Sequence, residues 1–314
     1  GETTPQEVRN KISKRMLGVS HPRPTAMIKA CGVAQFNADV QLPPDAVELA
    51  IAHSTQYHAL IKAVDTSITV KMPGVIGVMT AEDIKGTNRI RVSVPDQPVL
   101  CEDKVRLLGD PIVAVAAKTR DQARAAAAAV KVVYESLPVM MTPEEALAPG
   151  AYQIHNHVAN NINSSQPVIK GDAEKALKEA KTVVEADFST QTNHQAPLEP
   201  EVSAAYFEGE GENAQLVVVG RSIAIHSHLA QINEAVGYTN MRYREAFSGG
   251  HFGIKAGVVT EAVTAAAALY FKRPVRYIPS MEESMLMTSK RHAYNMKVKL
   301  AADASGHITA YFND

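Results

Sequence analysis

Residues 246–271 combine a glycine-rich loop with a helix that is apolar on nearly every side, and this combination limits the folds open to the chain. The loop contains Gly249, Gly250, Gly253 and Gly257, and the segment after it, "VVTEAVTAAAALYF", has no glycine. A helix with so broad an apolar surface needs neighbours on all sides. The helix is therefore predicted to be buried, with the loop at its N-terminal end.

The glycines of this loop allow a ligand to approach the backbone closely, because no Cβ stands in the way and positive φ angles are accessible. Ahead of a helix, exposed N–H groups attract phosphate, pyrophosphate or a metal oxo group. The phosphate loop of nucleotide-binding proteins needs Gly-Lys-Ser/Thr, but here Ala256 follows Lys255, and the dinucleotide spacing is absent too. On spacing alone, a packing turn and a ligand-binding loop remain equal alternatives.

The length and charge of the chain indicate an ordinary globular protein of two domains. It has 314 residues, of which 46% are hydrophobic and 21% charged, so each of two domains can bury a core. The net charge of -1 and the pI near 6.9 provide no field for steering nucleic acid or an anionic membrane. Nucleic-acid binding is therefore not expected.

The two cysteines, Cys31 and Cys101, stand in no paired-thiol motif. They cannot by themselves ligate an iron–sulfur cluster, and both are predicted to be small buried apolar side chains. The thiols are expected to be reduced. Because no segment resembles a signal peptide or offers about 18 consecutive apolar residues, we expect a cytoplasmic protein without membrane spans.

The first 145 residues contain an arm and a mixed α and β segment. A short helix capped by Thr4 and the proline-rich stretch after it form an arm over residues 1–26. From 27 to 145, apolar runs rich in valine and isoleucine indicate strands, and Thr119 is predicted to cap a helix. Prolines at 138, 143 and 149 predict a domain boundary.

The second segment, residues 150–314, also mixes helices and strands. Helices are expected at "DAEKALKEA" and "SIAIHSHLAQINEAVG", the latter ending at Gly237, and strands at "TVVEADFST" and "AQLVVVG". The last residues predict a hairpin with its turn at 303–306. Because its final strand continues to Asp314, this domain is expected to be incomplete.

Several stretches, in order, resemble the molybdenum-binding subunit of the xanthine dehydrogenase and aldehyde oxidoreductase family, the molybdenum hydroxylases. The loop is similar to the family's Gly-Gly-x-Phe-Gly-x-Lys motif. The remaining matching stretches are "HPRPTAMIKACGVAQFNADVQLP", "MPGVIGVMTAEDIKGTNRI", "VLCEDKVRLLGDPIVAVAA", "APLEPEVSAAYF" and "RPVRYIPSMEESMLMTSKRHAYNMKVKLAADASGHI". The resemblance covers nearly everything from about residue 20 onward.

This resemblance implies an α+β fold, with an α/β hammerhead domain followed by the first part of a molybdopterin-binding domain. It also implies a molybdenum ion held by a pterin dithiolene and by no protein side chain. Gly249, Gly250, His251, Phe252 and Gly253 would contact the cofactor, mainly through backbone N–H groups. "GRSIAIHSHLAQI" lacks the glutamine of xanthine-type enzymes and is closer to bacterial aldehyde oxidoreductases, which favours the cytosine dinucleotide form of the pterin.

The implied reaction is hydroxylation of an aldehyde or N-heteroaromatic carbon with oxygen from water, the electrons passing to iron–sulfur centres. The family's catalytic glutamate lies downstream of the matching stretches, so no catalytic residue is assigned here, and Glu199 and Glu261 are not substitutes for it. The expected partners are a second chain of the molybdenum subunit, an iron–sulfur subunit, and a flavin subunit as a further candidate. The chain alone is expected to be inactive.

Individual side chains near these motifs have simpler interpretations. His251 is expected to form a neutral wall of the pocket, and Lys255 to meet a carboxylate at the rim of the loop in preference to a cofactor phosphate. His226 and His228 do not share a helix face, so they do not predict a metal site. Arg276 is a candidate for an interface or for a solvated strand end.

Two other functions remain open at this stage. The chain could be a family subunit that keeps the fold without binding metal. It could also be an α/β module that binds a phosphate or nucleotide through residues 249–255. The intact Gly-Gly-x-Phe-Gly-x-Lys motif favours the catalytic interpretation over both.

Overall fold

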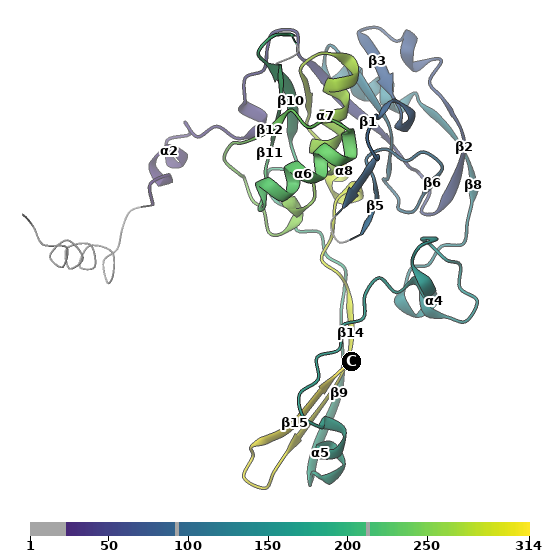
Figure 1. Ribbon diagram of the computed structural model, residues 1–314, viewed down its shortest axis with the longest axis vertical. Coiled ribbons are helices and arrows are strands. Elements are labelled where there is room, and N and C mark those ends of the chain that lie inside the picture. Colours follow the sequence, from purple (N-terminus) through teal and green to yellow (C-terminus); the bar gives the residue numbers. More distant parts are fainter. Residues whose placement is uncertain (1–22, 92–93, 212–213) are drawn as a thin grey trace, which may run out of the picture.

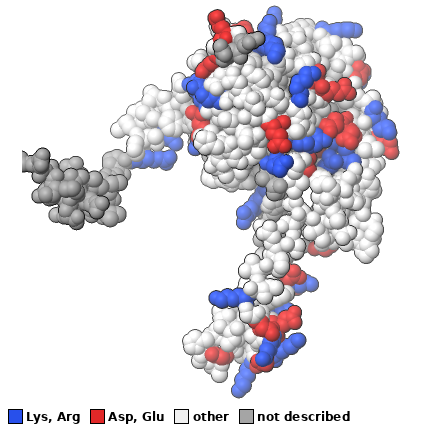
Figure 2. Space-filling model, in the orientation of Figure 1, with Lys and Arg blue, Asp and Glu red and all other residues white. Residues whose placement is uncertain are grey.

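The computed structural model describes residues 23–91, 94–211 and 214–314. The helix expected after Thr4 lies outside the described residues. Helix α2 (Ala26–Ala30) stands apart from the main body of the chain, and an elongated sheet projects from the body at another point (Figure 1). Charges of both signs are interspersed over the visible face, in keeping with the small net charge (Figure 2).

A mixed sheet of seven strands forms the centre of the body. Its order is β12-β11-β10-β13-β1-β7-β3, and β1 with β13 and β11 with β12 are the parallel pairs. The strands are β1 (Val47–His53), β3 (Val75–Met79), β7 (Pro111–Ala117), β10 (Ser203–Glu208), β11 (Gln215–Gly220), β12 (Met241–Glu245) and β13 (Val275–Tyr277).

This sheet crosses the boundary expected between residues 145 and 150. Strand β13, from the second segment, lies between β1 of the first segment and β10 of the second. One apolar cluster accordingly contains Leu49 together with Leu216, Val263 and Tyr277. The two segments therefore share a core, in contrast to the expectation of two domains with separate cores, because adjacent strands of one sheet must bury the same face.

Helices cover both faces of the sheet. Helix α7 (Val259–Phe271) packs with α6 (Ile225–Val236) over the face that carries Leu49, and α7 is buried along most of its length, as its composition predicts. Helix α3 (Arg120–Ala128) covers the opposite face, where Ala50 points. Alternate residues of β1 thus pack into two apolar layers, because successive side chains of a strand point to opposite faces of the sheet.

Smaller sheets and short helices complete the body. Strands β6, β2 and β8 form one sheet, and β4 with β5 forms a hairpin. Their bounds are β2 (Ala59–Asp65), β4 (Arg89–Arg91), β5 (Pro95–Pro98), β6 (Lys104–Val105) and β8 (Lys131–Ser136). The short helices are α4 (Pro143–Leu147), α8 (Met281–Met287), η1 (Asn37–Asp39), η2 (Thr69–Lys71), η3 (Ala81–Asp83), η4 (Ala159–Asn161) and η6 (Ile254–Ala256).

The projecting sheet has the order β15-β14-β9 and carries α5 beside it (Figure 1). Its elements are β9 (Thr182–Thr190), β14 (Tyr294–Ala302), β15 (Ile308–Asn313) and α5 (Ala173–Glu179). The predicted hairpin of β14 and β15 is confirmed, with Gly306 donating its N–H to Asp303 O at the turn.

Local signals in the sequence place several helix ends correctly. Thr119 accepts a hydrogen bond from the N–H of Gln122 and caps α3, and Gly237 ends α6 with a φ of 72°. Cys101 is buried as expected, but Cys31 is exposed at the end of α2. The prediction for Cys31 was wrong because α2 stands away from the core that would have covered it.

Within the described ranges, every helix is too short or too polar to traverse a bilayer.

Candidate functional site

The glycine loop follows β12 and holds an unusual backbone conformation before α7 begins. Gly250, Phe252 and Gly253 have φ angles of 122°, 49° and 94°. A left-handed φ is ordinary for glycine but costs a phenylalanine of the order of 1–3 kcal/mol. The Phe252 side chain is also 73% exposed, so its own burial does not repay this cost. Such strain at an exposed position is typical of a ligand-binding loop.

A buried ion pair fixes the loop from beneath. Lys255 Nζ lies 2.7 Å from Glu199 Oε2, and both side chains are almost fully buried. The same carboxylate oxygen accepts the N–H of Gly249 at 2.8 Å, and Oε1 accepts the N–H of Asn37 at 3.3 Å. The prediction that Lys255 meets a carboxylate is confirmed. Glu199 thus joins three separate stretches of chain at the base of the loop.

The glycines of the loop have different purposes. A Cβ on Gly249 would lie 2.6 Å from the Cβ of Glu199, and one on Gly250 would lie 2.9 Å from the Cβ of Pro197. A Cβ on Gly253 would meet no atom within 4 Å. The first two glycines therefore allow close packing, whereas Gly253 leaves an open face beside the backbone. The packing alternative is therefore seen at Gly249 and Gly250, and the open face at Gly253 leaves ligand binding as a prediction.

Three successive backbone N–H groups in the loop are available to a ligand. Among the described residues, nothing accepts a hydrogen bond from the N–H of Gly250, His251 or Phe252. Consecutive N–H groups in a turn with left-handed residues form a concave site for anions and oxo groups. The arrangement can bind a negatively charged or oxygen-rich ligand without any charged side chain.

His251 lines the same face and is held in the neutral form. Burial lowers its pKa, and the charges of Lys255 and Arg221 lower it further. Nδ1 accepts the N–H of Gly253 at 2.9 Å, so in the neutral ring the proton resides on Nε2. Nε2 is buried and has no partner within the part of the chain that the structure describes. It is a donor that a bound ligand could satisfy.

A cationic recess adjoins the loop. It has a volume of about 700 Å³ and is lined by Arg23, Lys29, Arg221 and Arg244 together with Glu245, which pairs with Arg221 at 2.9 Å. The excess positive charge favours an anionic group. These residues come from distant segments, so no sequence pattern predicts the recess, which only the folded chain brings together.

The other residues considered from the sequence have structural partners. His228 is buried, and its Nδ1 lies 2.7 Å from Ser222 Oγ. Arg276 Nε donates to Glu48 Oε1 at 2.9 Å on the neighbouring strand, so its guanidinium has a partner within the chain. Glu261 is fully buried and accepts the Tyr243 hydroxyl at 2.9 Å, and burial raises the pKa of its carboxyl.

Comparison with known proteins identifies the two segments. Residues 31–138 match the aldehyde oxidase and xanthine dehydrogenase a/b hammerhead domain, and residues 154–314 match the molybdopterin cofactor-binding domain. The chain is 35% identical to the aldehyde oxidoreductase of Megalodesulfovibrio gigas over 99% of its own length and 35% of that protein. It is 32% identical to the nicotinate dehydrogenase large molybdopterin subunit of Eubacterium barkeri, covering 94% of this chain and 69% of that subunit.

The fold agrees with these relationships. The structure of the aldehyde oxidoreductase from Desulfovibrio gigas superimposes with a TM-score of 0.89 at 35% identity, over 95% of this chain and 34% of that one. The chain thus spans about a third of the length of the aldehyde oxidoreductases it matches. The hammerhead and cofactor-binding folds, the domain matches and the sequence identity agree, and the chain belongs to the aldehyde oxidase and xanthine dehydrogenase family of molybdenum hydroxylases.

Proposed function

We propose that this chain forms one wall of the active site of a molybdenum hydroxylase, and that residues 249–253 contact the molybdopterin cofactor. The observation that carries the proposal is the row of N–H groups from Gly250 to Phe252, which have no acceptor among the described residues and lie in a partly exposed loop. The Lys255–Glu199 ion pair supports it, because a buried pair beneath the loop keeps its backbone in place before a ligand arrives.

The residues present suit a group of this chemistry. Gly253 leaves the backbone open on one side, and the buried Nε2 of His251 is a donor without a partner among the described residues. The recess with Arg23, Lys29, Arg221 and Arg244 suits the phosphate of a pterin cofactor. The cytosine dinucleotide form remains part of the proposal, on the resemblance to bacterial aldehyde oxidoreductases.

When bound, the molybdenum cofactor supplies transfer of an oxygen atom from water to carbon and takes up the two electrons released. The residues of this chain bind and orient it: the N–H groups from Gly250 to Phe252 donate hydrogen bonds, and neutral His251 offers a further N–H. Exposed Phe252 would present an apolar surface to the bound cofactor. The substrate class proposed is an aldehyde or an N-heteroaromatic compound.

The general base and the remaining cofactor contacts are proposed to come from outside these 314 residues. Glu199 pairs with Lys255 and Glu261 with Tyr243, so each carboxyl already has a structural partner. A relative named as a large molybdopterin subunit supports a second chain of the molybdenum subunit. Iron–sulfur clusters on a further partner, which would carry electrons away, and a flavin subunit belong to the same proposal.

The test is the molybdenum content of the native complex, purified through a partner chain so that this chain carries no tag. We expect close to one molybdenum per chain in the wild type. Gly253→Val places a side chain against the open face, and we expect it to retain less than about 10% of that molybdenum, because the loop can no longer approach the cofactor.

Gly306→Val is the matched control. Gly306 has a φ of 89° and open space around its Cβ position, but it lies in the distal hairpin. Valine there therefore causes the same kind of backbone strain without adding a side chain at the glycine loop. We expect this variant to keep its molybdenum. Full molybdenum in Gly253→Val would contradict the loop assignment. A wild-type complex without molybdenum would favour the non-catalytic subunit, and tight binding of a nucleotide instead would favour the phosphate-binding module.

A further inference from the structure

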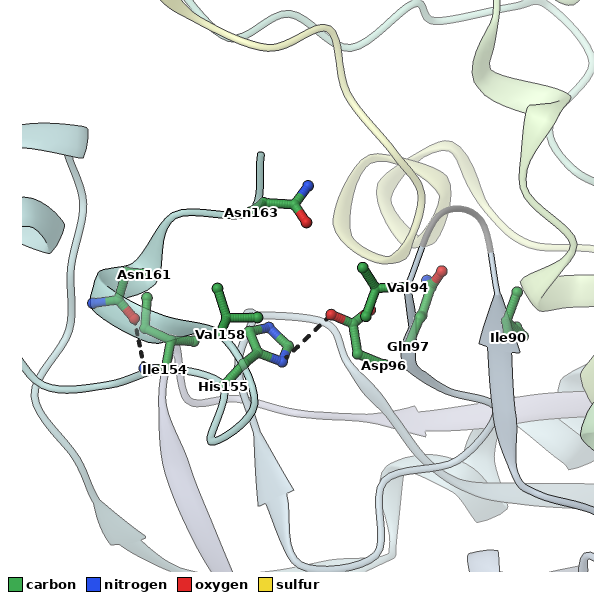
Figure 3. Close-up of a pocket in the computed structure, with 9 residues that line it drawn as sticks. All are labelled: Ile90, Val94, Asp96, Gln97, Ile154, His155, Val158, Asn161 and Asn163. Atoms are coloured by element: carbon green, nitrogen blue, oxygen red, sulfur yellow. Dashed lines mark hydrogen bonds and ion pairs between the residues drawn. The ribbon is translucent and has the colours of Figure 1, made fainter. Parts of the chain in front are cut away.

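A second polar site lies away from the glycine loop, where a stretch that we call the connector meets the β4–β5 hairpin. The connector, residues 148–163, leads from α4 into the start of the cofactor-binding match, and with β4 and β5 it lines a pocket of about 310 Å³. Figure 3 shows Asp96 of β5 and His155 of the connector pointing toward each other across this cavity, with Val94, Val158 and Asn163 around them.

Three side chains converge there with the atoms that bind metal ions. Asp96 Oδ2 lies 3.6 Å from His155 Nδ1 and 3.6 Å from His157 Nε2. The three atoms all lie within 4.8 Å of one another. In a tetrahedral zinc site with bonds of about 2.1 Å, the ligand atoms are about 3.4 Å apart. Two of the three separations are therefore nearly those of a metal site already, and the third requires a small movement.

The contacts among these residues are poor as hydrogen bonds. At 3.6 Å, each imidazole nitrogen is too far from the Asp96 oxygen for a normal bond. Among the described residues, neither His155 Nδ1 nor His157 Nε2 makes a hydrogen bond, so each nitrogen can offer its lone pair to a metal.

The turn that carries both histidines is held in place by two side chains. Gln153 Nε2 donates to the carbonyl oxygens of His155, Asn156 and Val158 at 3.0–3.2 Å. Asn161 accepts the N–H of Ile154 at 2.9 Å and donates to Tyr152 O at 2.9 Å. These bonds order the turn without using the ring nitrogens of either histidine. The ligand set is thus presented by a preorganised loop facing a strand.

The surroundings select the class of metal. Lys104 Nζ lies over the Tyr152 ring, and Arg106 donates to Ile154 O, so both cations contact the connector and neither is a ligand. A hard ion such as Mg²⁺ or Ca²⁺ depends on several oxygen ligands, and the group contains only one carboxylate, so such an ion is disfavoured there. Two imidazoles and one carboxylate instead suit a borderline ion such as Zn²⁺, and exposed His157 leaves room for water as a fourth ligand.

We propose that Asp96, His155 and His157 bind a divalent transition metal ion of the zinc type, which joins the connector to the β4–β5 hairpin. The site is structural: none of its residues belongs to the glycine loop, and its metal is independent of the molybdenum cofactor. Binding fixes the path of the chain between the hammerhead and the cofactor-binding segment. A metal bound only to the folded chain also stabilises it by mass action.

The experiment measures binding of Zn²⁺ to the full chain by calorimetry, and binding of Co²⁺ by its visible absorption, which reports tetrahedral nitrogen and oxygen ligands. We expect one equivalent of each. Asp96→Asn, His155→Gln and His157→Gln should each weaken binding by about 10- to 100-fold or more. Circular dichroism checks that each variant folds. Because the three substitutions lie in two separate elements, the others still test the proposal if one variant does not fold.

His307→Gln is the matched control. His307 Nδ1 also lies near a carboxylate, 3.7 Å from Asp303 Oδ2, but among the described residues this pair has no third side chain that could complete a metal site. We expect its Zn²⁺ affinity to equal that of the wild type. Absence of binding by the wild type at micromolar Zn²⁺ would overturn the proposal. Equal binding by all four variants would overturn it too, since the ion would then be held elsewhere.

Discussion

At the glycine loop, different residues hold the loop in place and face the site where a ligand would bind. Lys255 and Glu199 are buried and act beneath it, whereas Phe252 is exposed with a strained backbone above it. His251 spans both sides, since one ring nitrogen accepts the Gly253 N–H and the other is buried without a partner within the described chain. The side chains with the clearest charge are therefore structural, and the exposed backbone is what a ligand would meet.

Lys255→Met tests the holding function. The substitution leaves the Glu199 carboxylate buried without its cation, and removing one partner of a buried pair costs about 3–5 kcal/mol. We expect the free energy of unfolding, measured by urea denaturation of the purified chain, to fall by that amount.

Lys299→Met provides the comparison. Lys299 pairs with Glu185 at 3.0 Å, but both side chains are exposed, so the loss should stay within about 1 kcal/mol. Equal effects of the two substitutions would mean that the pair beneath the loop contributes no more than a surface ion pair.

At the scale of elements, the C-terminal end of α6 is completed by the other segment of the chain. The carbonyl oxygens of Glu234 and Ala235 accept the N–H groups of Thr87 and Asn88, which satisfies acceptors that a helix end leaves free. Gly86 permits this approach, because a Cβ on it would overlap the backbone at Gly237. The stretch before β4 therefore fixes the helix that leads through β12 to the glycine loop.

Gly86→Ala is expected to destabilise the protein by about 1–3 kcal/mol, the usual cost of forcing an extra carbon into a packed contact. Gly257→Ala is its control, since a Cβ there meets nothing within 4 Å and its φ of -89° suits any residue. Thermal unfolding of both variants measures the difference. Equal thermal stability of Gly86→Ala and Gly257→Ala would contradict the prediction, because the backbone at Gly237 would then move to admit the extra carbon at little cost.

Across the whole molecule, the seven-stranded sheet makes the two family domains one folding unit. Strand β1 has β7 on one side and β13 on the other, so the first segment alone would expose an edge of β1 and the apolar face that α7 covers. Leu49 and Met79 would lose the helix that buries them.

Residues 23–150, expressed alone, should therefore not fold. We expect no cooperative thermal transition from this fragment and strong binding of a dye for exposed apolar surface, whereas the described body of the full chain should unfold in one main transition. A fragment with native-like circular dichroism and a sharp transition would contradict the shared core.

Much of the local structure followed from the sequence. The all-round apolar composition of residues 258–271 predicted the buried helix α7, Thr119 and Gly237 marked helix ends, and the turn at 303–306 marked the hairpin. These features depend on neighbouring residues, and short-range propensities and caps determine them. The family motifs likewise singled out the glycine loop, because they are contiguous stretches of chain.

The sequence by itself determined the places of α3, α6, α7, the C-terminal hairpin and the glycine loop, and it predicted a carboxylate as the partner of Lys255. Only the tertiary structure decided which carboxylate it meets, since Glu199 is 56 residues away. The same holds for the place of β13 beside β1 and for the meeting of Asp96 with His155 and His157. The physical reason is common to all three: strand order and long-range burial depend on the free energy of the whole core, and no local pattern encodes them.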